Sequence, residues 1–462
     1  MKTVCLVFSL LFFNTIFGQS LSERIGKSVS QLEQESQFEH AIISLYIVDG
    51  KTGRSVFEKN AQVGLAPASC QKVVTSAAAF ELLGKEYQYK TLIKIRKSND
   101  STCLLIDASG DPTMGSWRWE STKMDNVYRN ITAALKKNNI NLLGSDVLIN
   151  NSSFTHQPVP DGWVWQDIGN YYGAGAWPFN WHENQYELAL ISANSEGTPT
   201  TIKSFDPVSA EIPVSNYITS GKKGSGDNAY IYSAPYNPTA FATGTIPPGQ
   251  NNFTISGSMP DPGKVFIKGL RSYLMQNNIA ISEGSNTGFL IQGTSNSSEE
   301  TILTVTSPPM DSINYWFLKK SVNLYGEALV KTIAYEKATT GSTDTGVAII
   351  KDFWSRNGVE KSALNIIDGS GLSPANRVTT IALVKVLQYA KGRPWFSSFY
   401  NALPEINGIK MKDGYIGGVR SYAGYVKSKS GNEYIFSFIV NNFDGSPGSV
   451  REKMWKILDL LK

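Results

Sequence analysis

The sequence predicts a mixed α/β fold of the α+β type, with an antiparallel sheet covered by helices and a β-rich region inserted into it. Segments 419–429 and 433–440 alternate in polarity around a Ser-Gly-Asn turn, as an antiparallel strand pair does. An amphipathic helix over 450–461 follows them. Helix-rich stretches also stand on both sides of a long run of short strands. A terminal strand pair beside helices suits a sheet with helices on its faces.

Composition narrows the class of protein. At 462 residues the chain exceeds one ordinary domain, so we expect two or three. The hydrophobic fraction of 41% and the aromatic fraction of 11% indicate packed globular structure rather than disorder. The net charge is only +4, and no basic run has interleaved aromatic residues, so we expect no nucleic-acid partner.

Residues 1–18 predict an export signal. Lys2 gives a positive start, residues 4–17 are mostly apolar, and Gly18 offers a small residue for cleavage. The apolar run is too short and wrongly flanked for a membrane span, and no later stretch approaches one. We therefore expect a soluble protein, without a membrane span, that is periplasmic or secreted.

The first part of the mature chain predicts a helix, two strands and a second helix. Residues 21–38 have helical apolar spacing, and 42–48 and 55–57 are the two strands. The second helix spans 66–84. Pro67 and Ser69 suit the start of a helix, where Ser69 is a good N-cap or first-turn residue. The middle of the segment has an apolar stripe, formed by Val73, Ala77 and Phe80, and Gly84 ends the helix.

Beyond residue 84 the pattern changes to short strands separated by Gly, Ser, Asn and Pro. The predicted strands are 89–95, 103–106, 143–149 and 253–255, with one helix at about 124–138. Segment 162–173 is dense in aromatic residues. Two interpretations stay open for it: it lines a groove for sugars or peptide, or it packs a seam between domains.

Helical spacing returns after residue 299, at 311–335, 347–356 and 379–390. The predicted domain organisation is therefore a split domain over 19–85 and 299–462. Residues 86–298 are the β-rich insertion, which we expect to form two small domains.

Three short motifs carry the predicted chemistry: Ser69-x-x-Lys72, Ser321-x-Asn323 and Lys412-Asp413-Gly414. Ser-x-x-Lys alone is weak, since 220–223 also fits it, but the ordered partners strengthen it. Ser69 would attack a carbonyl carbon and form an acyl-enzyme. Lys72 would take the serine proton, because burial and a nearby Lys412 both favour the neutral amine.

The remaining motif residues have supporting roles in this hypothesis. Ser321 would relay a proton to the departing amine, and Asn323 would hold the peptide bond of the substrate. Backbone N–H groups of Ser69 and of a residue on the strand after Gly414 would form the oxyanion hole.

Other chemistries fit the sequence poorly. The three histidines, His40, His156 and His182, have no metal-ligand spacing and do not suggest a Ser-His-Asp hydrolase. No phosphate-binding glycine loop follows a strand. We therefore expect no metal and no cofactor. Cys70 and Cys103 remain after removal of the signal; a disulfide between them is open, but we favour two free thiols.

Across nearly all of the mature chain, these motifs resemble the low-molecular-mass class C penicillin-binding proteins. These are D-alanyl-D-alanine carboxypeptidases that also act as endopeptidases. Ser321 follows Ser69 by 252 positions, a spacing that suits the long insertion of this family. The motifs that carry the resemblance are 67–69, 110–113, 169–173, 321–325, 368–373 and 423–426. It implies a penicillin-binding fold with two inserted domains, peptidoglycan peptides as substrates and β-lactams as covalent inhibitors.

One position departs from the family pattern. Lys412-Asp413-Gly414 stands where the family has Lys-Thr-Gly or Lys-Ser-Gly, whose hydroxyl helps to bind the terminal carboxylate of the substrate. Asp413 would repel that carboxylate at close range. Either Asp413 pairs with Lys412 or another cation, or the enzyme acts less on a free C-terminal D-Ala. Arg420 could meet the carboxylate instead.

Two alternatives remain open. A catalytically idle, peptidoglycan-binding relative would use the same groove for adhesion or scaffolding, and penicillin labelling would separate it from an enzyme. A β-lactamase is the second alternative, although the long insertion speaks against it.

Overall fold

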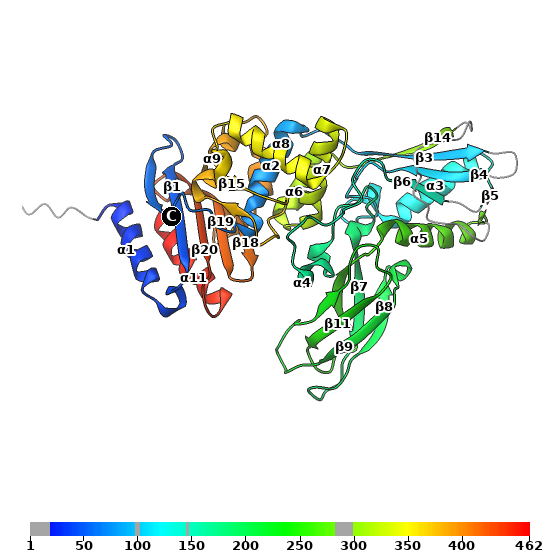
Figure 1. Ribbon diagram of the computed structural model, residues 1–462, viewed down its shortest axis with the longest axis horizontal. Coiled ribbons are helices and arrows are strands. Elements are labelled where there is room, and N and C mark those ends of the chain that lie inside the picture. The colour runs from blue at the N-terminus through cyan, green and yellow to red at the C-terminus, as the bar shows by residue number, and fades with distance from the viewer. Residues whose placement is uncertain (1–18, 98–101, 145–146, 282–298) are drawn as a thin grey trace, which may run out of the picture.

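The computed structural model describes residues 19–97, 102–144, 147–281 and 299–462. Figure 1 shows an elongated molecule in which both ends of the chain build one lobe and the middle of the chain builds the rest. The mixed α/β class predicted from the sequence is confirmed. The expected export signal, 1–18, lies outside the described residues.

The lobe built from both chain ends contains a six-stranded antiparallel sheet. The predicted strand pair at the C-terminal end lies in its middle and pairs with the first strand of the chain. In spatial order the strands are β17 (Glu405–Ile406), β18 (Ile409–Ile416), β19 (Val419–Lys427), β20 (Glu433–Asn441), β1 (Ile42–Asp49) and β2 (Ser55–Lys59).

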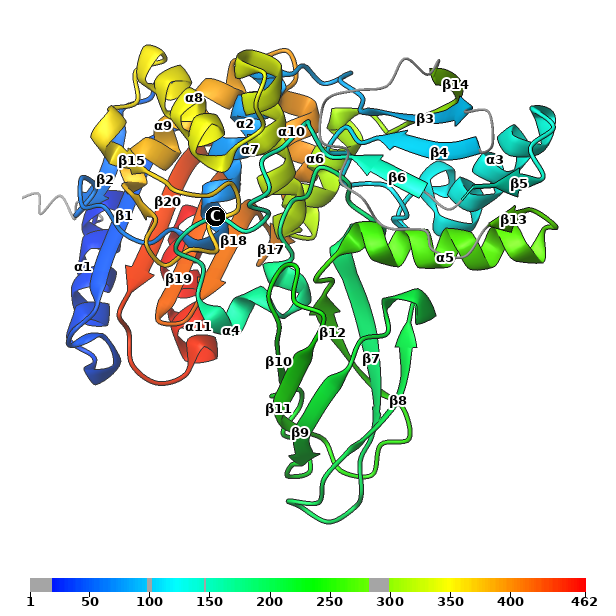
Figure 2. The ribbon, with the colours of Figure 1, turned by 45° about the vertical axis from the view of Figure 1, so that its right-hand side comes forward.

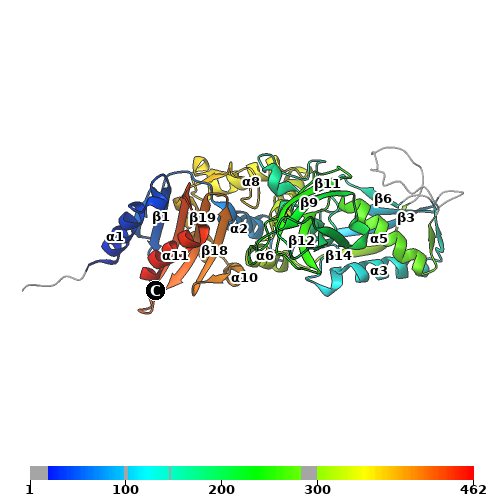
Figure 3. The same ribbon diagram turned by 90° about the horizontal axis from the view of Figure 1, so that it is seen from below.

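Both faces of this sheet are covered, as the alternation along β20 shows. Phe436 and Phe438 pack with α1 (Leu21–Glu33) and α11 (Pro447–Leu458), whereas Ile435 and Ile439 face the opposite helical layer. Figure 3 shows α11 lying across β18 and β19. The opposite layer consists of α2 (Lys72–Leu82), α6 (Met310–Lys319), α7 (Asn323–Ala338), α8 (Thr343–Arg356), α9 (Thr380–Lys391) and α10 (Phe396–Ala402). The small pair β15 (Leu364–Asn365) and β16 (Arg377–Val378) lies near it.

The middle of the chain forms two further lobes (Figure 2). The first has a four-stranded sheet and two helices: β14 (Glu299–Thr306), β3 (Lys90–Lys97), β4 (Thr102–Asp107), β6 (Val147–Asn150), α3 (Met124–Lys137) and α5 (Pro262–Gln276). A short parallel pair, β5 (Leu142–Leu143) and β13 (Ala280–Ile281), accompanies it.

The second of these lobes consists of two three-stranded sheets. One has the order β12 (Phe253–Ser258), β7 (Gln185–Ile191), β8 (Thr201–Asp206). The other has the order β10 (Tyr230–Tyr232), β11 (Ala240–Ile246), β9 (Val214–Ser220). The short helix α4 (Trp165–Ile168) lies beside β10, on the side of this lobe that faces the lobe built from both chain ends (Figure 2).

The expectation of one helix in the insertion was wrong, because the insertion also contains the short α4 and the longer helix α5. Its start has ordinary signals: Asp261 accepts a hydrogen bond from the Lys264 N–H, and Pro262 stands at the first helical position. Its buried side chains, which include Phe266 and Leu270, pack into the core that both inserted lobes share.

Strand β14 bears on the predicted domain bounds. It pairs with β3 along its whole length and thus belongs to the inserted four-stranded sheet. We propose that the insertion extends to about residue 306 rather than to 298. Among the described residues, no helix is both long and apolar enough to cross a membrane.

Candidate active site

The turn that carries Ser69 is a 3-10 helix, Ala68–Gln71, placed directly before α2. The predicted single helix is therefore tighter at its start, and Ser69 lies in that first turn without capping it. Ala68 is buried and has a left-handed backbone with φ 45°, a conformation that costs energy for a residue with a Cβ. A Cβ on Gly371 would lie 2.0 Å from the Ala68 carbonyl oxygen, so the Ser69 turn needs a glycine at that position.

Strand β18 supports the same turn from its other side. A Cβ on Gly414 would lie 2.8 Å from the Ser69 nitrogen, so the strand backbone passes directly beside the Ser69 turn. Ser421 on β19 donates a hydrogen bond of 2.6 Å to the Pro67 carbonyl. These contacts fix Ser69 against the edge of the sheet.

No disulfide joins Cys70 and Cys103, so the preference for two thiols over a disulfide is confirmed. The Cys70 Sγ donates to the Lys412 carbonyl at 3.2 Å, which ties the turn to β18. Burial raises the pKa of the Cys70 thiol to about 12, which makes it a structural rather than a reactive group.

Lys72 is fully buried and its Nζ lies 2.8 Å from Ser69 Oγ. The same Nζ donates to Asn323 Oδ1 at 2.6 Å and to the Ser370 carbonyl at 2.8 Å. Burial, and next the charge of Lys412, lower the pKa of Lys72 to about 7. A neutral amine at this position can accept the proton of the serine hydroxyl.

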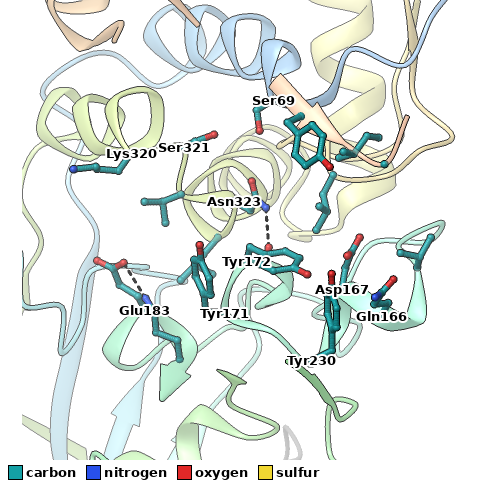
Figure 4. A pocket seen from close by; sticks show the side chains of 18 of the residues that line it. Ser69, Gln166, Asp167, Tyr171, Tyr172, Glu183, Tyr230, Lys320, Ser321 and Asn323 are labelled. Atoms are coloured by element: carbon teal, nitrogen blue, oxygen red, sulfur yellow. Dashed lines mark hydrogen bonds between the residues drawn. The ribbon is translucent and has the colours of Figure 1, made fainter. Parts of the chain in front are cut away.

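The second predicted motif lies in the break between α6 and α7. Ser321 has a left-handed backbone, φ 58°, and Asn323 is the first residue of α7. Asn323 donates from Nδ2 to the Tyr172 carbonyl at 2.7 Å, and Figure 4 shows Ser69, Ser321 and Asn323 around the same space. Ser321 Oγ makes no hydrogen bond with another residue of the described part of the chain, so it is available to a substrate.

Lys412 is nearly as buried as Lys72, but its ammonium points to its own neighbour. It donates to the Asp413 carbonyl at 2.7 Å and to Asp413 Oδ1 at 3.0 Å. Burial raises the pKa of Asp413, but Lys412 and Arg420 outweigh it, so the pKa falls below its ordinary value and the carboxylate is ionised. One alternative left open by the sequence, pairing of Asp413 with Lys412, is thus what the structure contains.

Three predicted substrate-binding residues do not line the cavity beside Ser69. Asp413 and Gly414 lie on β18, and Arg420 lies on the next strand, β19, opposite Tyr415. The Arg420 guanidinium stacks over Tyr415 and Tyr422, at 5.4 and 5.9 Å from the ring centroids. Residues 415–417, which follow Gly414, reach the cavity in their place.

Two buried acids to which the sequence analysis gave no role bind the loop that contains Ser370, a hydrogen-bond partner of Lys72. Glu327 on α7 accepts from the Ser370 N–H at 2.9 Å, and Asp368 accepts from the Gly371 N–H at 2.8 Å. Together they fix the loop whose Ser370 carbonyl binds Lys72. Burial and the neighbouring Asp368 raise the pKa of Glu327. The sequence contained a signal for each acid. Asp368 lies in the family motif 368–373, and Glu327 lies four residues after Asn323, so it shares a helix face with that motif residue.

A cavity of about 880 Å³ opens between Ser69 and the inserted lobes. Its walls combine the three motif regions with residues of the insertion: Ser69, Trp117, Arg118, Val164, Gln166, Asp167, Tyr171, Tyr172, Glu183, Gln185, Tyr230, Lys320, Ser321, Val322, Asn323, Leu324, Leu372, Pro374, Tyr415, Ile416 and Gly417. The aromatic segment 162–173 contributes both to the cavity wall and to a seam between lobes, and its proposed ligands, sugars or peptide, stay a prediction. Parts of it line the cavity, whereas Trp163 is buried at the seam and donates to Asp368 Oδ2 at 3.0 Å.

A buried ion pair joins the insertion to α7 at the cavity wall. Glu183, with φ 52°, has a fully buried side chain and accepts from Arg118 Nε at 2.7 Å. The Tyr325 hydroxyl, two residues after Asn323, donates to the same carboxylate at 2.6 Å. Figure 4 shows Glu183 beside Lys320 and Tyr171. This network sets the position of the inserted lobes against the helix that carries Asn323.

The fold and the hydrogen-bonded pair of Ser69 and Lys72 fit one class of protein, the serine hydrolases. The model of the D-Ala-D-Ala carboxypeptidase 3 (S13) family matches residues 25–460, and the chain belongs to this family. The family resemblance expected from the motifs is confirmed.

Curated relatives and solved structures agree with this assignment. The chain is 24% identical to a D-alanyl-D-alanine carboxypeptidase of Actinomadura sp., over 93% of this chain and 82% of that protein. It is 22% identical to D-alanyl-D-alanine carboxypeptidase DacB of Haemophilus influenzae, over 86% of this chain and 84% of that protein. The crystal structure of penicillin binding protein 4 (dacB) from Haemophilus influenzae superposes with a TM-score of 0.79 at 19% identity, covering 94% and 99% of the two chains. This likeness confirms the expected penicillin-binding fold.

Proposed function

We propose that the protein hydrolyses D-alanyl-D-alanine stem peptides and cross-links of peptidoglycan through an acyl-enzyme on Ser69. The observation that carries this proposal is the buried Lys72 Nζ, 2.8 Å from Ser69 Oγ at the cavity wall. Its family and its similarity to D-alanyl-D-alanine carboxypeptidases support the substrate class.

The proposed reaction has two steps. Neutral Lys72 takes the proton of Ser69 while Oγ bonds to the D-Ala carbonyl carbon, the C–N bond then breaks, and the amine leaves with a proton. Water next attacks the ester, so that the peptide acid departs and Ser69 regains its proton. Ser321 Oγ, which faces the cavity unpaired within the described chain, suits the relay to the departing amine. Asn323 is the candidate that holds the substrate amide.

The negative charge of the tetrahedral intermediate needs donors beside Ser69. The Ser69 backbone N–H and the N–H of Tyr415, on the strand that passes the nucleophile turn, are our candidates. Each such donor contributes about 3–4 kcal/mol in acyl-transfer enzymes.

The Lys412–Asp413 ion pair bears on substrate choice. It leaves this motif without a net positive charge, so it attracts the free carboxylate of a C-terminal D-Ala less than Lys-Thr-Gly would. In a cross-link the D-Ala continues through an amide and has no free carboxylate there, so its binding loses less from the missing positive charge. We therefore propose that endopeptidase activity is favoured relative to carboxypeptidase activity.

The same acyl-enzyme chemistry makes β-lactams covalent inhibitors, because the lactam carbonyl also acylates an activated serine. The Haemophilus influenzae protein of similar fold has been crystallised with a β-lactam. Residues 1–18 and the peptidoglycan substrate together support export to the periplasm or secretion.

Product analysis tests the proposed function. Purified muropeptides with and without cross-links would be incubated with the wild-type chain and with Ser69→Ala, and the products identified by mass spectrometry. We expect loss of terminal D-Ala and cleavage of D-Ala cross-links by the wild type only. A wild-type protein that binds muropeptides but leaves them intact would be the idle relative.

A further inference from the structure

The outer face of the sheet β10-β11-β9 is rich in exposed aromatic side chains. Tyr217 is 66% exposed and Phe241 is 37% exposed, whereas Ile218, Ile231 and Ala242 on the inner face are buried. Register places one set of side chains together on the outer face: Ser215, Tyr217, Thr219, Tyr230, Tyr232, Phe241, Thr243 and Thr245. We name this set the aromatic face. All of its members are aromatic or carry a hydroxyl group, and none is charged.

Two rings of the aromatic face stack on each other, and a third ring lies beside them. Tyr232 and Phe241 stack in parallel with centroids 4.7 Å apart, and Trp165 from α4, 49% exposed, lies 5.9 Å from Tyr232. Single exposed apolar residues are common on proteins, but a contiguous exposed group of rings indicates a binding surface.

The aromatic face continues into the cavity beside Ser69. Tyr230 belongs to the face and also lines the cavity, with Gln166 and Asp167 of α4 on the same wall. Figure 4 shows Tyr230 next to Asp167 and Gln166. A substrate held at Ser69 that has a second part can therefore extend over Tyr230 onto the sheet.

We propose that the aromatic face binds the saccharide chain to which the substrate peptide is attached. This inference rests on the proposed function, which supplies a peptide linked to a polymer of N-acetylated sugars. The C–H groups on the flat side of a pyranose ring pack against aromatic rings, and sugar hydroxyls and acetamido groups bond to tyrosine and threonine hydroxyls. The uncharged character of the face suits a neutral polymer better than a nucleic acid or an anionic lipid surface.

Direct binding tests this inference without catalysis. The probe is a soluble N-acetylglucosamine hexamer, titrated by calorimetry into the full chain with Ser69→Ala. We expect saturable binding that weakens about tenfold in Tyr217→Ala/Phe241→Ala, since each lost ring contact removes a several-fold factor. The matched control is Tyr315→Ala on α6, also 37% exposed and packed edge-on against a neighbouring ring, which should bind like the parent.

A rate comparison separates this inference from the proposed function. Tyr217→Ala/Phe241→Ala, with Ser69 intact, should cleave sugar-free D-Ala-D-Ala peptide as the wild type does. Its kcat/KM on glycan-linked peptide should fall about tenfold. If neither enzyme cleaves either substrate, the proposed function fails. The saccharide inference is overturned if the ratio of kcat/KM on glycan-linked peptide to kcat/KM on sugar-free peptide is the same for the double variant and the wild type. It is also overturned if the only effect of the double variant is to convert a dimer into a monomer.

Discussion

At the scale of single residues, the buried amine of Lys72 predicts a pH dependence. Its pKa is about 7, whereas an unfolded lysine has about 10.4. The neutral base is therefore absent at low pH and present at high pH, so the acylation rate should rise through pH 7 and then level off. Rates of penicillin acylation from pH 5 to 9 measure this.

The variant Lys72→Arg is the matched test of the same group. A guanidinium stays protonated, so acylation should fall by several orders of magnitude across the whole pH range. A rate within a few-fold of wild type would remove Lys72 from the role of base.

The lowered pKa of Lys72 also means that the unfolded chain binds more protons than the folded one between about pH 7 and 10. The contribution of Lys72 to the free energy of unfolding should therefore increase with pH in that window.

Asp413 carries the residue-scale prediction on substrate choice. Asp413→Thr frees Lys412 from its ion pair, so kcat/KM for a peptide ending in free D-Ala should rise about tenfold, with little change for cross-link cleavage. The pH midpoint of acylation should also move down, because the Asp413 charge raises the pKa of Lys72. Asp413→Asn, which keeps the shape, should act in the same direction. An unchanged ratio of the two activities would return substrate choice to the inserted lobes.

At the scale of elements, two glycines test the contact between the Ser69 turn and the loop 368–373. Gly371 lies in that loop, and Gly358, which lies outside it, is the matched control. Gly371 and Gly358 both have φ 82°, so an added Cβ costs each about 1–2 kcal/mol. Only at Gly371 would the Cβ also meet a neighbour, 2.0 Å from the Ala68 oxygen; at Gly358 it meets nothing within 4 Å.

The prediction follows from that difference. Gly371→Ala should lower the midpoint of denaturation more than Gly358→Ala and should slow acylation by tenfold or more, because the Ser69 turn must move. Gly358→Ala should acylate at the wild-type rate. Equal acylation by both variants would show that the loop does not position Ser69.

Elements with strong local signals could be predicted from the sequence. Helix α2 with Gly84 after it, the pair β19–β20 and helix α11 follow from periodicity and turn residues alone. Local pattern cannot reveal that Ala68 takes a left-handed backbone, because that conformation is imposed by packing against Gly371 and β18. The same limit applies to β14, whose place in the inserted sheet depends on pairing with β3, about 200 positions away.

At the scale of the whole molecule, the Arg118–Glu183–Tyr325 network joins the insertion to α7. Glu183→Ala would leave the largely buried guanidinium of Arg118 without its partner, which costs up to about 3–5 kcal/mol. We expect faster hydrogen exchange in segment 182–185 and at the start of α7. The control is Glu299→Ala, which removes a partly exposed ion pair with Arg96 and should cost less than about 1 kcal/mol. Equal effects of the two substitutions would contradict a docking role for Glu183.

The site as a whole combines motifs that the sequence contains with partners that it does not reveal. The order of Ser69, Lys72, Ser321, Asn323 and Lys412 along the chain is enough to indicate the chemistry. Geometry adds the buried acids that hold the Ser370 loop and the pairing of Lys412 with its neighbour. The contact of Glu327 with the Ser370 loop depends on packing between distant segments. The pairing of Lys412 with Asp413 is local, and the structure selects it from the alternatives that the sequence left open.

Above all, we propose that Ser69, activated by Lys72, is the nucleophile of this enzyme. The most direct test of this proposal is mass spectrometry of the protein after incubation with benzylpenicillin, followed by digestion and mapping of the adduct. We expect one penicilloyl group per chain, on the peptide that contains Ser69, and no adduct on folded Ser69→Ala. An adduct on another residue, or a wild-type protein that cleaves D-Ala-D-Ala peptides but is never acylated at Ser69, would contradict the proposal.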